Sequence, residues 1–162
     1  MTDRTAPTPE PDAKSTLRAQ MRALRRSLTD VPERSEELWR HVVALPELAL
    51  ADTLLVFATL PGEPDTRPLL AWCAATGRLA AAPEANVDPS WPDVVIAPGL
   101  AFTAARERLG QGGGWYDRFL ADARADCTVI GVCFIEQLVD ALPTEPHDIS
   151  MDVVVTDRGV LR

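Results

Sequence analysis

The sequence contains few of the residues that build metal centres and disulfide frameworks. Its 162 residues include two histidines and three cysteines, and the cysteines show no CxxC spacing. Zinc sites in proteins need closely spaced sets of these ligands, so the sequence contains no zinc pattern. The cysteines, Cys73, Cys127 and Cys133, are odd in number, and we expect them to be reduced thiols of a cytoplasmic protein.

Positive charge and long apolar runs are also scarce. Sixteen lysines and arginines face 24 aspartates and glutamates, which gives a formal net charge of −8. Binding to a phosphate backbone needs a basic surface, so nucleic acid is not an expected partner. No run approaches the length of a membrane span, and the start of the chain has no apolar signal segment. We therefore expect a cytoplasmic protein without a membrane partner, and take a monomer as the working assumption.

Glycine, by contrast, is concentrated in one place. Four of the nine glycines lie within residues 110–114, between Arg108 and the aromatic pair Trp115-Tyr116. Glycine allows positive φ angles and close backbone approach, and a glycine-rich turn before a helix directs N–H groups at a phosphate. A flexible surface turn is the alternative, but such a turn would rarely end in two aromatic residues. The spacing matches neither GxxxxGK[ST] nor GxGxxG, so neither common nucleotide motif is present.

Apolar periodicity predicts an α/β fold. Helices are expected over 13–28, from a capping box at Asp30–Glu33 to about residue 45, over 68–75 and over 115–120. Strands are expected over 53–58, 79–82, 93–97, 128–135 and 152–156. This alternation favours a Rossmann-like three-layer α/β/α sandwich with a mostly parallel sheet. We expect residues 1–11 to form a disordered tail and 12–162 a single domain.

Several charged residues are candidates for a site: Glu63 and Asp148 lie in connections beside strands, and such folds bind ligands beyond the carboxyl ends of the strands. Lys14 and Arg18, one helical turn apart, either reach a shared anion or belong to a solvated face. Glu63 follows the first strand and either fixes a polar substrate group or is an ordinary charged turn residue. Asp117 and Asp148, with Asp152, either share a divalent cation or cap strand ends. No residue is assigned as a catalytic acid, base or nucleophile.

Five segments together resemble the 5-formyltetrahydrofolate cyclo-ligases, also named methenyltetrahydrofolate synthetases. They follow one another in the family's order: Lys14–Arg18 (KxxLR), Pro61–Thr66, Ala97–Phe102 (PGLAF), Arg108–Arg118 (RLGxGGGYYDR) and His147–Thr156 (HDxxvDxvvT). The resemblance implies that ATP drives ring closure of 5-formyltetrahydrofolate to 5,10-methenyltetrahydrofolate, with ADP and phosphate as products. The formyl oxygen would attack the γ-phosphate, and a folate nitrogen would close the ring as phosphate leaves.

The resemblance also implies roles for individual residues. Glu63 and Trp115 would contact the reduced folate, and Asp117 and Asp148 would bind Mg²⁺. The residues that would hold ATP are Lys14, Arg18, Arg108, Leu109, Gly110, Gln111, Gly112, Gly113, Gly114, Trp115 and Tyr116.

The chain departs from the family pattern at several positions. Thr103 and Arg106 stand where the family usually has Asp and Gly, and Trp115 replaces a tyrosine. The connection over residues 84–92 is shorter than the segment that helps to wall the family's folate pocket. Two alternative hypotheses follow: a relative that binds nucleotide or folate without turnover, and an ATP-dependent enzyme for another small acyl or carboxylate substrate.

Overall fold

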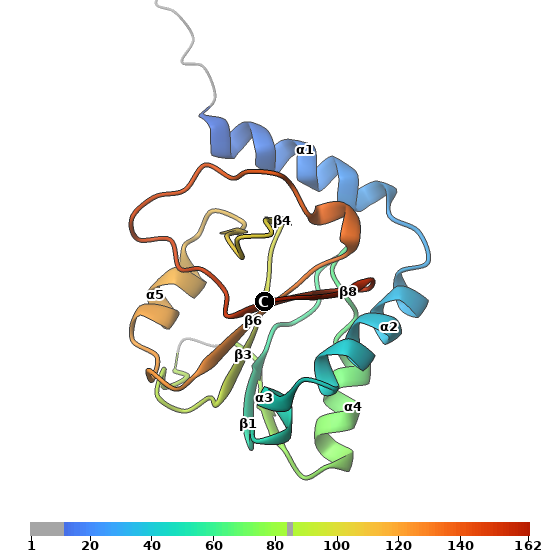
Figure 1. Ribbon diagram of the computed structural model, residues 1–162, viewed down its shortest axis with the longest axis vertical. Helices are drawn as coiled ribbons and strands as arrows, with labels where there is room; N and C mark the ends of the chain where they lie inside the picture. The colour runs from blue at the N-terminus through green and yellow to red at the C-terminus, as the bar shows by residue number, and fades with distance from the viewer. Residues whose placement is uncertain (1–11, 84–85) are drawn as a thin grey trace, which may run out of the picture.

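The computed structural model describes residues 12–83 and 86–162, so the predicted disordered tail, residues 1–11, lies outside the described residues. A six-stranded sheet with the order β2-β1-β3-β6-β7-β8 forms its centre (Figure 1). Its strands are β1 Thr53–Val56, β2 Leu79–Ala81, β3 Val94–Pro98, β6 Thr128–Val132, β7 Val153–Thr156 and β8 Gly159–Leu161. All neighbours pair in parallel except β7 and β8, which are antiparallel. The predicted mostly parallel sheet is confirmed.

Helices cover the sheet unevenly. They are α1 Ala13–Ser27, α2 Val31–Val43, α3 Pro46–Ala49, α4 Arg67–Ala75 and α5 Trp115–Ala121, with a 3₁₀ turn, η1, at Ile135–Gln137. Residues of α2, α3 and α4 pack on one face of the sheet, and residues of α5 pack on the other. The first helix, α1, lies across the carboxyl ends of the strands (Figure 1).

The central strands are apolar throughout because both of their faces are buried. In β1, Leu54 and Val56 join the core beneath α2 and α4, whereas Leu55 joins the core beneath α5. The same alternation holds in β3, where Val94 and Val95 lie in different clusters. The continuous apolar runs of the sequence therefore reflect a two-sided core, as expected for the α/β class.

The layer that contains α5 is thin. The chain leaves β2, passes β1 and enters β3, yet the described part of this connection (82–83 and 86–93) contains turns and no helix. Val87 packs against the core beneath α5, together with Phe102 of the small β4–β5 hairpin (β4 Ala101–Phe102, β5 Arg108–Leu109). The third layer of the predicted sandwich is thus one short helix supplemented by loops and a hairpin.

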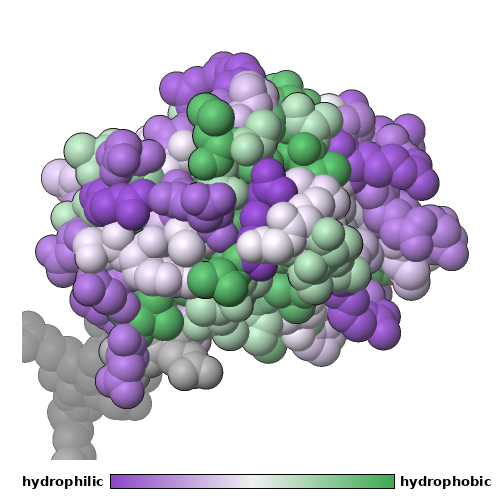
Figure 2. Space-filling view, turned by 90° about the horizontal axis from the view of Figure 1, so that it is seen from below, coloured by the Kyte–Doolittle hydropathy of each residue, from purple (hydrophilic) through white to green (hydrophobic). Residues whose placement is uncertain are grey.

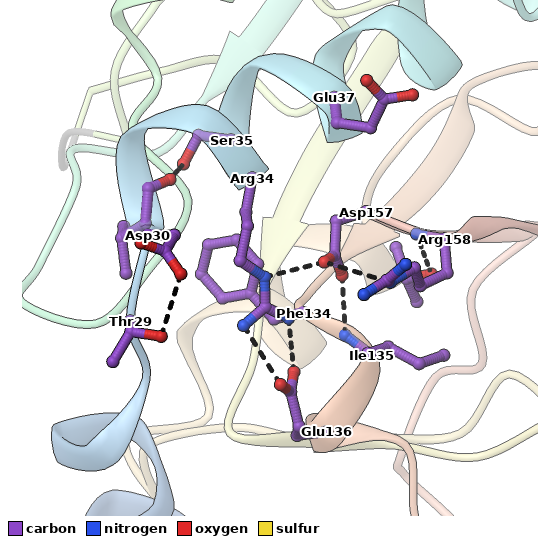
Figure 3. Close-up of polar contacts among 12 residues, drawn as sticks. Thr29, Asp30, Arg34, Ser35, Glu37, Phe134, Ile135, Glu136, Asp157 and Arg158 are labelled. Atoms are coloured by element: carbon purple, nitrogen blue, oxygen red, sulfur yellow. Dashed lines mark hydrogen bonds and ion pairs between the residues drawn. The ribbon is translucent and has the colours of Figure 1, made fainter.

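Ion pairs fasten α2 to the sheet (Figure 3). Arg34 donates from Nε to Asp157 at 2.8 Å, bonds Glu136 with its other nitrogens, and lies 4.8 Å from the centre of the Phe134 ring. Asp157 is 5% exposed and also accepts from the backbone N–H of Ile135 at 2.9 Å. This buried cluster joins α2 to the segments that follow β6 and β7.

The second helix starts after Asp30 with proline in its first turn, as the sequence predicts, but its cap and its end differ from the prediction. The capping box at Asp30 is wrong: Asp30 has φ of 56°, and its side chain makes no capping hydrogen bond. Its carboxylate accepts from the Thr29 hydroxyl instead. The helix ends at Val43, and a separate short helix starts at Pro46, because proline disfavours helical geometry in the residue before it.

The opposite side of the molecule, seen from below in Figure 2, mixes hydrophobic and hydrophilic residues. Among the exposed apolar residues, Leu50, after α3, and Leu79, in the edge strand β2, are 87% and 63% exposed. Single exposed leucines are common on folded proteins. In the part of the chain that the structure describes, no helix is both long and apolar enough to cross a membrane.

Candidate functional site

Helix α1 presents two different faces to the rest of the molecule. Met21, with Leu17 and Leu24, packs on an apolar cluster that includes Leu100 and Leu109. This is the 3.6-residue stripe that the sequence predicts. The helix is therefore held in place by its apolar face. Its basic stripe, which consists of Lys14, Arg18, Arg22 and Arg25, faces the loops at the carboxyl ends of the strands.

Each residue of the basic stripe contacts one of these loops. Lys14 Nζ lies 2.9 Å from Asp148, and Arg18 donates from Nε to the carbonyl of Gly110 at 3.0 Å. Further along, Arg22 bonds Gln111, and Arg25 donates to the carbonyl of Pro61 at 2.9 Å. The stripe is thus not simply a solvated face. It ties three loops, distant in sequence, to one helix.

The glycine-rich loop is anchored at both ends. Gly112 and Gly114 have φ of 111° and 68°, so these two positions require glycine, and Gly114 directly precedes α5. Arg118 returns from α5 to donate to the carbonyl of Gly113 at 2.8 Å. A β-carbon at Gly112 would come within 3.5 Å of the Arg18 guanidinium carbon. The loop therefore has a defined conformation, and the Arg18 guanidinium group lies beside it.

Arg108, at the start of this loop, carries a poorly neutralised charge. Its Nη1 donates to the carbonyl of Pro98 at 2.9 Å, its guanidinium lies 5.0 Å from the Tyr116 ring centre, and its buried Nε has no partner. Burial lowers the pKa of Arg108, and the nearby Asp117, Tyr116 and Asp148 counteract this only partly. An anion placed beside this group would relieve the cost of burying the charge.

One cavity of about 660 Å³ collects these groups. Every site residue predicted from the sequence lines it: Lys14, Arg18, Glu63, Arg108, Leu109, Gly110, Gln111, Gly112, Gly113, Gly114, Trp115, Tyr116, Asp117 and Asp148. The loop between η1 and β7 adds Pro143, Thr144, Glu145 and His147 to the wall. The structure therefore brings together the whole predicted set, from residues up to 134 positions apart.

The aromatic pair at the start of α5 forms one side of the cavity. Trp115 stacks on Phe119 at 4.9 Å with an angle of 15° between the rings, and meets Tyr116 edge-on at 4.9 Å. One face of the indole is thus already occupied by Phe119. Burial raises the pKa of Tyr116, the single tyrosine of the chain, so its phenol is neutral and able to donate a hydrogen bond.

Acidic groups also line the cavity. Glu145, His147 and Asp148 lie close enough to share a metal ion, and within the described ranges they are the one such group of three or more. Asp117 lies outside it and accepts from the N–H of Ile149 at 3.1 Å. Burial alone would raise the pKa of Asp148, but its bonds from Lys14 and from the Glu145 N–H lower it below the ordinary value.

Asp152, the third aspartate considered from the sequence, has a structural role. Its Oδ2 accepts from the backbone N–H of Val129 at 2.7 Å, at the end of the sheet remote from the cavity. The sequence left two roles open for the aspartates, binding of a divalent cation and capping of a strand end. Asp152 caps a strand end. Asp117 and Asp148 lie at the cavity.

Glu63 is not an ordinary turn residue, because it is 5% exposed. Its Oε2 accepts from the N–H of Leu60 at 2.9 Å, and its Oε1 lies 3.5 Å from the Arg25 guanidinium. Burial raises the pKa of Glu63 above its ordinary value, and the Leu60 N–H and Arg25 counteract this only in part. Sequence reasoning found Glu63 but not its pairing with Arg25.

Gln137 is a second residue that sequence reasoning missed. Its side chain is fully buried, donates to the carbonyls of Gly99 and Leu100 at 3.0 and 3.1 Å, and accepts from the N–H of Phe134 at 2.9 Å. These bonds fix the turn after β3, whose Pro98 carbonyl receives Arg108. A lone glutamine within the apolar segment FIEQLV was the one signal available.

Known proteins of similar sequence and structure agree on one family. A model described as "5-formyltetrahydrofolate cyclo-ligase family" matches residues 81–157. The chain is 30% identical to the 5-formyltetrahydrofolate cyclo-ligase of Escherichia coli over 180 positions, covering 86% of this chain and 98% of that protein. It is 44% identical to the Mycolicibacterium smegmatis enzyme of the same name, but over 70 residues, or 36% of that protein.

Solved structures point the same way. The 5,10-methenyltetrahydrofolate synthetase of Aquifex aeolicus superimposes with a TM-score of 0.82 and 25% identity, covering 92% of each chain. The Mycoplasma pneumoniae synthetase, at 22% identity and a TM-score of 0.80, supports the fold. With the near full-length match to the E. coli enzyme, these findings show that the chain belongs to the 5-formyltetrahydrofolate cyclo-ligase family.

Proposed function

We propose that this enzyme cyclises 5-formyltetrahydrofolate to 5,10-methenyltetrahydrofolate with ATP and Mg²⁺, releasing ADP and phosphate. One observation carries the proposal. A single cavity unites the basic residues of α1, the glycine-rich loop, Glu63 and the acidic loop around Asp148. Such a reaction requires anion-binding, metal-binding and polar substrate contacts, and residues suited to each of them line this cavity.

The glycine-rich side of the cavity is the proposed place for the ATP phosphates. Arg18 and Arg108 both present guanidinium groups here, and Arg108 has a buried nitrogen without a partner. Guanidinium groups form strong charge-assisted hydrogen bonds to phosphate. Lys14 would exchange its contact with Asp148 for a phosphate oxygen. These residues fit a triphosphate because their positive charges lie beside the glycine-rich loop, whose backbone a phosphate group can approach closely.

Asp117 and Asp148 are the proposed ligands for Mg²⁺. Carboxylate oxygens suit this hard cation, and both side chains line the cavity beside the basic groups. Mg²⁺ usually keeps several water ligands, so two carboxylates together with phosphate oxygens are sufficient. When bound, the ion would neutralise charge on the transferred phosphoryl group.

Glu63 and Trp115 are the proposed contacts for the reduced folate. The reaction needs little covalent help: the formyl oxygen bonds the γ-phosphorus, ADP leaves, and the neighbouring folate nitrogen then attacks the formyl carbon, losing its proton as phosphate departs. Positioning and charge neutralisation dominate such chemistry. The neutral Tyr116 phenol and the Arg108 guanidinium lie side by side in the lining of the cavity and would bond the formyl oxygen that is transferred to phosphate.

Formation of the methenyl chromophore tests this proposal. Purified protein mixed with 5-formyltetrahydrofolate should develop the absorbance only when both ATP and Mg²⁺ are present, with ADP released in equal amount. The matched control is Asp117→Asn, which keeps the side-chain volume but lowers the affinity for Mg²⁺. Folded protein that binds ATP and forms no chromophore would refute the folate reaction.

The thin layer beside β2 favours a second candidate, a binding protein without turnover. The E. coli match extends over 180 positions, more than the 162 residues of this chain, so the relative has positions that this chain lacks. The described connection from β2 to β3 contains no helix to wall the folate end. Calorimetry distinguishes the two: a binding protein would take up ATP or folate without releasing ADP.

A further inference from the structure

The pair formed by Arg25 and Glu63 lies deeper than any other charged group of α1. The side chains of Arg25 and Glu63 are 7% and 5% exposed, whereas that of Lys14 is 17% exposed. Arg25 Nη2 donates to the Pro61 carbonyl at 2.9 Å and lies 3.5 Å from Glu63 Oε1. One guanidinium group therefore contacts both the backbone and the carboxylate of the same loop.

The loop that Arg25 contacts, residues 60–63, has the geometry of a tight turn. The Glu63 N–H donates to the Leu60 carbonyl at 3.0 Å, and Gly62 has φ of 81°. This matches a type II turn, which requires glycine or asparagine at the third position. A β-carbon at Gly62 would come 3.0 Å from Cβ of Arg25, so the turn lies directly on that side chain. Both oxygens of the Glu63 carboxylate thus have a neighbour that fixes their orientation: the Leu60 N–H for Oε2 and Arg25 for Oε1.

We propose that Arg25 is a positioning residue that holds the Glu63 carboxylate in place for the folate substrate. The inference rests on the proposed folate reaction and adds a residue that neither the motifs nor the comparisons assign. A charged carboxylate this deep needs a partner, because removal of one member of a buried pair leaves the other uncompensated. An ionised Glu63 accepts hydrogen bonds, as the N–H groups of a reduced pterin ring require; a protonated one would also donate.

Among the described residues, few charged or titratable groups lie near Glu63. Arg25 approaches from α1, Tyr116 from α5, and Arg108 contacts Tyr116 from β5. Tyr116 is neutral, and Arg108 donates from Nη1 to the Pro98 carbonyl. Arg25 is thus the charged group in direct contact with the carboxylate, and its removal should raise the pKa of Glu63.

Three variants test the proposal. Arg25→Met removes the charge at similar volume, Arg25→Lys keeps the charge but cannot reach both partners, and Arg26→Met is the control on the adjacent exposed residue. The titration of Glu63 is followed by carbon NMR of the glutamate carboxyls, with Glu63→Gln used for assignment. We expect its midpoint to rise by at least one pH unit in Arg25→Met, by less in Arg25→Lys, and not at all in Arg26→Met.

Kinetics then connect the pair to the substrate. Arg25→Met should raise KM for 5-formyltetrahydrofolate at least tenfold and move the acidic limb of the pH profile upward, with the Kd for ATP changed less than twofold. Arg25→Lys should recover part of both effects. Should Arg25→Met fail to fold, Arg25→Lys decides by the same readouts. An unmoved Glu63 titration, or equal losses in folate and ATP binding, would overturn the proposal.

The two readouts separate this inference from the proposed function. If wild-type protein forms no methenyl product, the folate reaction is refuted, whatever the NMR titration gives. If the wild type is active but Arg25→Lys and Arg25→Met match Arg26→Met in KM and in titration, the positioning role alone is refuted.

Discussion

Aspartate and arginine side chains lie at both ends of the parallel strands, but their hydrogen-bonding partners differ between the two ends. At the amino ends, Asp93 accepts from the N–H groups of Asp52 and Thr53 at 2.8 and 3.0 Å and pairs with Arg124 at 2.6 Å. At the carboxyl ends, Arg108 has a buried nitrogen without a partner, and Asp148 shares Lys14 with Glu145.

This difference separates stability from function. At the amino ends, polar groups are satisfied within the fold, so each carboxylate secures the start of a strand. At the carboxyl ends, charges face a cavity and keep bonding capacity for a ligand, as expected for α/β folds. Substitutions at the amino ends should therefore affect folding alone, and those at the cavity should affect catalysis more than folding.

The largest effect is expected for Arg108→Lys. Lysine keeps the charge but loses the planar group that bonds Pro98 and faces the Tyr116 ring. We expect kcat/KM to fall about 100-fold, which corresponds to about 2.7 kcal/mol of transition-state stabilisation. The free energy of unfolding, measured with urea, should change by less than about 1 kcal/mol. Wild-type turnover in this variant would contradict the division between the two ends.

The converse substitution is Asp93→Ala at the amino ends. It leaves the N–H groups of Asp52 and Thr53 without their acceptor and removes the partner of Arg124. We expect the free energy of unfolding to fall by about 2 kcal/mol, with kcat and KM for both substrates unchanged at a temperature where the variant stays folded. Asp126→Ala, which removes the more exposed partner of Arg124, is the matched control and should cost less than about 0.5 kcal/mol.

The pKa of Asp93 gives a smaller, pH-dependent effect. Bonds from Arg124 and from the Asp52 N–H lower this pKa from 3.8 to about 2. A carboxyl group with a depressed pKa contributes stability that is present above its unfolded pKa and lost as the pH falls through the folded value. Wild-type protein should thus lose about 1 kcal/mol from this group between pH 5 and pH 2, after allowance for solvent screening.

Asp93→Asn is the variant that isolates this effect. Asparagine keeps an acceptor oxygen but does not titrate, so its curve of unfolding free energy against pH should be flatter over the same interval. Parallel curves for the two proteins, obtained from urea titrations at each pH, would mean that Asp93 is not the group responsible.

The smallest effect is expected at a strained residue near the cavity. Arg106, where the family usually has glycine, has φ of 65° in the turn between β4 and β5. Arg106→Gly should raise the free energy of unfolding by up to about 1 kcal/mol, because glycine adopts this conformation without strain. Arg106→Ala keeps the strain and should not stabilise the protein. Since Arg106 does not line the cavity, turnover should stay the same in both variants.

The sequence predicted those features that depend on local pattern. Helix α1, the apolar strands and the short helix after the glycines follow from periodicity, and the site residues follow from motifs of fixed spacing. The β4–β5 hairpin and β8 were missed: β4 and β5 have two residues each, too few for a periodic signal, and β8 contains one partly exposed apolar pair after its glycine. The capping box failed because Asp30 adopts a left-handed conformation, which side-chain type alone does not reveal.

Buried polar contacts could not be predicted for a different reason. Arg25 and Gln137 look like surface residues in the sequence, and only tertiary packing turns them inward. Each serves another residue of the site: Arg25 directs Glu63, and Gln137 holds the turn that receives Arg108. Such partners lie on other elements, 38 positions away for both Arg25 and Gln137, and are recognised once the fold is known.

The position of α1 across the carboxyl ends also determines the order in which the site is completed. Lys14 lies 134 positions before its partner Asp148. Contacts of such high sequence separation form late, since a long loop must close first. We therefore expect the contact between α1 and the loop before β7 to be among the last to form during folding. Completion of the cavity would thus report that the sheet between these two segments has already folded.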